Sequence, residues 1–159
     1  MPSTRARALG WPATIAALAL LWSATAFAAS QGGLYIAGDG FSFSTAAERG
    51  LAQNPGGRRF FVLTLPPEAG ALLRTAPPAQ VRLRDRVIAA NGVLLVCQRD
   101  LDNGRINASA LVEGVVPVRG FPARGSPQLP HGERYFPGEN PAQLPAANEA
   151  LRRLRSTCS

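Results

Sequence analysis

The sequence predicts an α/β protein with a single open, mainly parallel sheet flanked by helices. Uninterrupted apolar runs, of which Gly92-Val-Leu-Leu-Val-Cys97 is the clearest, are typical of strands that are buried on both faces. Segments with the 3.6-residue period of a helix alternate with these runs. Proline and glycine stand where the segments end, as element boundaries require.

Four strands are expected, near residues 33–38, 59–65, 92–97 and 114–118. After the first strand, Ser44 or Thr45 can cap a helix that ends before Pro55, and Glu48 can complete a capping box with Thr45. After the second strand we expect a short turn or helix over 69–73. A longer helix then begins at Pro78, and Gly92 stands at its C′ position.

Residues 1–28 have the pattern of a secretory signal peptide. Arg5 and Arg7 precede an apolar segment from Trp11 to Trp22, and Ala26-Phe27-Ala28 provides a cleavage site. An uncleaved anchor is the alternative, but the segment is short for a membrane span. We therefore expect an exported chain with no membrane span after signal removal. It would be organised as an α/β domain over 29–120, a Pro/Gly-rich arm over 121–142 and a C-terminal helix over 143–159.

The composition points to a bacterial protein, and export from a bacterial cytoplasm then indicates the periplasm. All 17 basic residues are arginine, and with the abundant alanine, glycine and proline this favours a GC-rich genome. Without Arg5 and Arg7, 15 arginines oppose 10 acids, which gives a net charge of +5. Outside the cytoplasm we expect no nucleic-acid partner, and this charge indicates a solvated basic surface or, alternatively, an acidic partner.

The C-terminal segment predicts an amphipathic helix that docks on the core. Its apolar positions fall on one stripe, formed by Leu144, Ala147, Leu151, Leu154 and Cys158. The single histidine, His131, lies in the arm without the neighbouring ligands that a metal site needs. Gly38-Asp39-Gly40 lacks the glycine spacing of a dinucleotide fingerprint. From these two observations we expect neither a metal nor a cofactor.

Cys97 is the candidate reactive residue, because chemistry in open α/β sheets gathers at the carboxyl ends of strands. Arg99 is the candidate stabiliser of a Cys97 thiolate. The alternative is that Cys97 is a small buried hydrophobic residue. A disulfide with Cys158 is chemically permitted in an oxidising compartment. We expect the two not to be bonded, because Cys158 lies one residue from the end, where fraying is normal.

The segment 90–97, followed by Ile106, Leu111 and Gly114-Val-Val-Pro-Val118, resembles the DsrE/DsrF-like sulfur-relay family. Upstream, Arg59–Leu65 and Ala71-Leu-Leu73 are similar to that family's second strand and the segment after it. The resemblance implies a flavodoxin-like fold, a tendency to form homo-oligomers and, in the sulfur-relay members, a persulfide carried on the cysteine that Cys97 matches.

Two functions follow, and the residues leave open whether the chain is an enzyme. In the first, an exported DsrE-like domain acts as a non-catalytic binding or assembly module with a protein partner in the bacterial envelope. In the second, Cys97 is a thiol-dependent sulfur carrier. We favour the first, since the sulfur-relay relatives work in the cytoplasm. A dithiol oxidoreductase is disfavoured because there is no Cys-x-x-Cys, and a hydrolase because there is no Gly-x-Ser-x-Gly.

Overall fold

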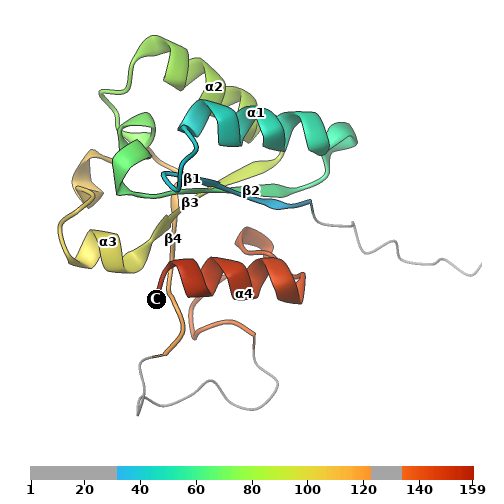
Figure 1. Ribbon diagram of the computed structural model, residues 1–159, viewed down its shortest axis with the longest axis vertical. Helices are drawn as coiled ribbons and strands as arrows, with labels where there is room; N and C mark the ends of the chain where they lie inside the picture. The colour runs from blue at the N-terminus through green and yellow to red at the C-terminus, as the bar shows by residue number, and fades with distance from the viewer. Residues whose placement is uncertain (1–31, 123–133) are drawn as a thin grey trace, which may run out of the picture.

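The computed structural model describes residues 32–122 and 134–159, and it confirms the predicted fold class. Four strands form one parallel sheet whose spatial order, β1-β2-β3-β4, is also their order in the chain (Figure 1). They are β1 (Leu34–Ala37), β2 (Phe60–Thr64), β3 (Gly92–Cys97) and β4 (Val116–Val118). Each strand lies inside the range that its apolar run predicts. The expected signal peptide, residues 1–28, lies outside the described residues.

One face of the sheet is covered by α1 (Phe43–Gln53), α2 (Pro78–Ala89) and the 3₁₀ helix Pro66–Leu72. Parallel strands that follow the chain order place all their right-handed crossover helices on the same face. The core on this side is formed by strand residues Phe60, Val62, Leu94 and Val96 packed against Phe43, Ala46, Ala47, Leu83 and Val87. The topology therefore leaves the second face without a crossover helix.

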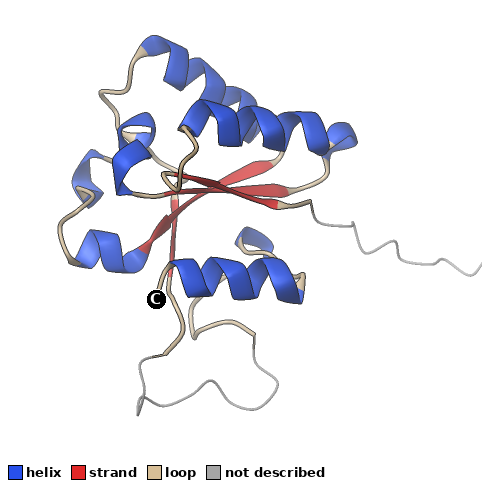
Figure 2. Ribbon diagram, viewed as in Figure 1, coloured by secondary structure: helices blue, strands red, loops and turns tan. Residues whose placement is uncertain are grey.

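The second face is covered by α4 (Asn148–Thr157), on the side of the sheet away from α1 and α2 (Figure 2). Because side chains alternate along a strand, the other half of the strand residues point toward α4. Phe61, Leu63, Leu95 and Cys97 contact Leu144, Leu151, Leu154 and Cys158 there. A ten-residue helix is marginal in isolation, so this burial holds α4 in place. Helix α4 thus packs on the sheet through Leu151, Leu154 and Cys158.

The start of α1 differs from the expectation. Ser42, rather than Ser44 or Thr45, is the N-cap, and its Oγ accepts a hydrogen bond from the Thr45 amide at 3.1 Å. The helix begins at Phe43, whose ring is fully buried and whose amide donates to the Glu68 carboxylate at 2.8 Å. Because this ring is buried, the first turn begins two or three residues earlier than the expected caps indicate.

The end of α2 also differs. Asn91, with φ 65°, adopts the left-handed conformation that was expected of Gly92. Gly92 instead begins β3, where a Cβ atom would lie 2.5 Å from Cγ1 of Val87 and 2.7 Å from the ring of Phe60. Glycine is needed at position 92 for close packing of α2 on the sheet.

Helix α4 begins at Asn148 and not at residue 143, because Pro145 interrupts the expected stripe. Leu144 remains in the core but lies in the loop after the 3₁₀ helix Pro141–Gln143. Short helical elements also follow β3, namely α3 (Gln98–Asp102) and the 3₁₀ helix Ala108–Ala110. None of the helices in the described parts of the chain is long and apolar enough to cross a membrane.

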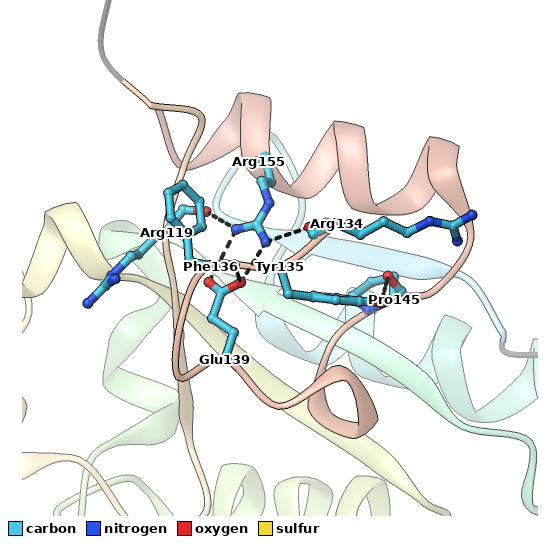
Figure 3. A network of polar contacts seen from close by, with 7 residues as sticks. All are labelled: Arg119, Arg134, Tyr135, Phe136, Glu139, Pro145 and Arg155. Carbon is cyan, nitrogen blue, oxygen red and sulfur yellow. Dashed lines mark hydrogen bonds and ion pairs between the residues drawn. The ribbon is translucent and has the colours of Figure 1, made fainter. Parts of the chain in front are cut away.

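Arg155 fixes the segment after residue 133 against α4 and the end of β4 (Figure 3). Its side chain is 3% exposed and lies 2.6 Å from the Glu139 carboxylate. It also donates to the carbonyls of Arg119 at 2.8 Å and Arg134 at 3.1 Å, and it stacks on the ring of Phe136. A buried guanidinium with this many partners selects one position for the returning chain.

Candidate functional site

Cys97 and Cys158 form a disulfide, so the prediction that they are not bonded is wrong. Their Cα atoms are 5.1 Å apart, and the two residues are 0% and 2% exposed. The bond joins the carboxyl end of β3 to the end of α4. Neither sulfur is a thiolate in this state, and neither is accessible to a large reactant.

The prediction rested on fraying of the chain end and took no account of which face of the sheet the C-terminal helix covers. The last residue of β3 follows the alternation of its strand, so Cys97 points to the same face as Leu95. Helix α4 packs on that face and ends beside Cys97, and face packing thus brings the sulfurs together.

The C-terminal residues are also held by hydrogen bonds. The Ser159 hydroxyl accepts from the amide of Phe121 at 2.9 Å and donates to the carbonyl of Arg155 at 2.8 Å. At Gly120, a Cβ atom would lie 2.5 Å from the carbonyl oxygen of Cys158, so the two segments are in close contact. Cys158 is therefore held between α4 and the segment that follows β4, and the expected fraying is not seen.

Arg99, the expected thiolate stabiliser, has other partners. Its Nη1 donates to the carbonyl oxygen of Ser159, and its Nε lies 3.6 Å from Oδ1 of Asp100. The side chain is 38% exposed. Arg99 therefore lies at the disulfide and helps to hold the end of α4 beside β3, rather than stabilising a free thiolate.

Asp100 is the polar residue of this region that the sequence did not single out. It is fully buried in the first turn of α3, and neither carboxylate oxygen has a hydrogen-bond partner among the described residues. Arg99 and Arg105 lie within 4 Å of Oδ1, at 3.6 and 3.8 Å. The only sequence signal is an acidic residue near a helix N-terminus, which is too common to indicate a site.

A groove of about 590 Å³ runs along the free edge of β1, between α1 and α4. Its floor is the strand itself with Gly32 and Gly33, and its walls carry Ala46 and Arg49 of α1 and Ala147, Glu149, Ala150 and Arg153 of α4 or its cap. A smaller hollow of about 330 Å³ lies beside β4. The volume along β1 is within the range of roughly 300–1,000 Å³ that is usual for ligand sites.

The described residues contain no group of three or more His, Cys, Asp or Glu that could hold a metal ion. His131 lies outside them. The turn at Gly38-Asp39-Gly40 closes on itself, since the Gly38 amide donates to the Phe41 carbonyl at 2.8 Å. The main features of the described surface and core are therefore a closed disulfide and an open groove.

Comparison with known proteins adds no relative to this picture: the chain matches no protein-family model, no curated protein and no solved structure. The resemblance to DsrE/DsrF-like proteins therefore stays a prediction from the sequence. The described part of the chain folds as a four-stranded parallel sheet with helices on both faces.

Proposed function

We propose that the chain is an exported, disulfide-stabilised binding module of the bacterial envelope, with its DsrE-like sheet as the scaffold. The observation that carries the proposal is the buried bond between Cys97 and Cys158. Sulfur transfer needs a thiolate that can attack a donor and present its sulfur to an acceptor. A buried disulfide at the only two cysteines offers neither step, whereas it does stabilise a scaffold.

The same bond supports periplasmic localisation. Structural disulfides persist in oxidising compartments and are rare in the bacterial cytoplasm. This agrees with the signal-like pattern of residues 1–28, where an apolar segment follows Arg5 and Arg7. The partners we propose are a protein of the periplasm and further copies of this chain. The exposed groove along β1 gives such a module a surface to bind with.

The sulfur-carrier alternative requires a reductant that opens the bond before Cys97 can react. Reduction would also free the end of α4, because Cys158 and the Arg99 contact to Ser159 both hold it. Each turnover of a carrier would then loosen α4, the helix that covers the second face of the sheet. This coupling favours the binding module.

Alkylation of thiols in living cells tests the proposal. Cells that express the full chain are treated with a thiol reagent before lysis, and labelling is read by mass. The matched control is Leu18→Arg, which places a charge in the apolar segment of the signal and should retain the chain in the cytoplasm. We expect an unlabelled exported protein and a labelled retained variant. Labelled cysteines in the wild type, or a wild type that stays in the cytoplasm, would refute the proposal.

A further inference from the structure

The backbone of β1 presents unused hydrogen-bonding groups along the groove. The carbonyl of Gly33 accepts from the amide of Phe61 in β2 at 3.1 Å, and the carbonyl of Ala37 accepts from the amide of Leu65, just after β2, at 2.9 Å. Backbone groups of successive residues point to opposite sides of a strand, so those of Leu34 and Ile36 face away from β2. Within the described parts of the chain, the backbone groups of Leu34 and Ile36 form no hydrogen bond to another backbone group. Two amides and two carbonyls thus line the floor of the groove.

The two edges of the sheet differ in a way that bears on binding. On the opposite edge, β4 is three residues long and contains an exposed Pro117, which cannot donate a hydrogen bond. Proline on an edge strand is a common protection against unwanted strand pairing. β1 contains no proline or charged residue, and the sheet therefore remains open to strand addition only at β1.

The walls of the groove determine which side chains an added strand could carry. Alternate side chains of an incoming strand would point toward α1 and toward α4. Ala46 on α1, with Ala147 and Ala150 on the other wall, leaves room for them. Arg49 lies on the α1 wall, and Arg153 and Glu149 lie on the α4 wall, so two positive charges and one negative charge line the groove. Neither arginine forms an ion pair within the described residues.

We infer that the β1 groove binds an extended, acidic segment of a partner protein, which adds to the sheet as a fifth strand. This inference rests on the proposed binding function and names its site and the chemistry of its partner. Main-chain hydrogen bonds to Leu34 and Ile36 give affinity, and carboxylates opposite Arg49 and Arg153 give selectivity. The net charge of +5 that remains after removal of the signal also attracts an acidic partner.

A second copy of this chain fits the groove less well than a single extended segment. The β1 edge lies on the floor between two helices, so the edge of a second copy is recessed in the same manner. A second copy would have to bring its own β1, with its own α1 and α4 on either side, to within about 4.8 Å of this strand. A lone strand has no such walls.

The test uses the oxidised protein purified from the exported fraction and a labelled hexapeptide of valines with two adjacent glutamates at its centre, whose side chains point to opposite walls of the groove. A peptide with lysine in place of glutamate is the ligand control. Arg49→Glu with Arg153→Glu removes the wall charges. Arg86→Glu with Arg152→Glu, at exposed positions outside the groove, changes the net charge by the same amount. Binding is measured by fluorescence anisotropy, and amide exchange is followed at Leu34 and Ile36.

We expect the glutamate peptide to bind the wild type and the outer-charge variant alike, and the groove variant about tenfold more weakly or worse. Exchange at Leu34 and Ile36 should slow only when this peptide is present. Absence of binding, equal binding of the lysine peptide or equal weakening in both variants would overturn the inference. Slow exchange at Leu34 and Ile36 without peptide would also overturn it. Protection that is independent of protein concentration would mean that a segment of the same chain covers β1, and protection that rises with concentration would mean that a second copy does. None of these results bears on the disulfide or on the export of the chain. Those two properties carry the proposed function and are measured separately by alkylation in cells.

Discussion

Opening the Cys97–Cys158 bond should remove a large share of the stability of the fold. The bond closes a loop with a sequence separation of 61 residues. Loop-closure entropy for that length corresponds to about 4 kcal/mol. Domains of this size are stable by roughly 5–15 kcal/mol, so the loss should be visible in any unfolding experiment. Helix α4 should suffer most, because its end is tied to the sheet by this bond.

Urea unfolding of the wild type with and without reductant measures this loss directly. Reduced wild type is a better reference than Cys97→Ala with Cys158→Ala, since the alanines add the cost of buried cavities to the cost of the open loop. The melting temperature should fall by roughly 10–15 °C on reduction. A change below about 1 kcal/mol, with the bond shown to be present before reduction, would refute the reasoning from loop length.

Three further outcomes are expected. Leu95→Asp should lower the free energy of unfolding by several kcal/mol, because Leu95 is 0% exposed, whereas Arg82→Ala at an exposed position should change it by less than about 0.5 kcal/mol. Arg155→Ala should cost about 3 kcal/mol, because the buried guanidinium is lost and the partly buried Glu139 carboxylate is left without its cation. The exposed Arg152→Ala should cost little, and urea unfolding measures both pairs. Burial raises the pKa of Tyr135 above its ordinary value of 10.0. The stability linked to the neutral phenol is complete below pH 10.0 and is lost as the pH rises through the raised pKa, so Tyr135→Phe should show a shallower loss of stability in this range.

Each of these outcomes has a result that contradicts it. Equal unfolding midpoints for Leu95→Asp and Arg82→Ala would mean that the core is misplaced. Equal losses for Arg155→Ala and Arg152→Ala would mean that the buried network in Figure 3 adds nothing to stability. An unchanged alkaline loss in Tyr135→Phe would mean that this phenol is solvated in the folded protein.

The strands could be predicted because each is an unbroken apolar run, and the fold class followed from their alternation with helical segments. The helix ends could not be placed as well, since they depend on contacts distant in sequence. Phe43 is helical because its ring is buried against the sheet. Gly92 is needed because Val87 of α2 and the ring of Phe60 leave no room for a Cβ atom there. Propensity and capping patterns contain no information about either contact.

The candidate site was predictable only in part. The sequence identified Cys97 at the end of β3, but its pairing with Cys158 depends on which face α4 covers. That face follows from a strand order without reversal, which puts every crossover helix on the other side. Arg155 looked like one of several arginines near a helix end, and only the returning segment buries it. The β1 groove exists because two distant helices flank one edge, and no local pattern indicates that.

The state of Cys97 in the exported protein tests the central claim most directly. The protein is alkylated in the cell, digested without reductant and analysed by mass spectrometry. We expect a single cross-linked species that contains both the Cys97 and the Cys158 peptides, which separates into two only after reduction. An alkylated Cys97, or a Cys97 peptide that carries an additional sulfur atom, would contradict the account and would favour the sulfur carrier.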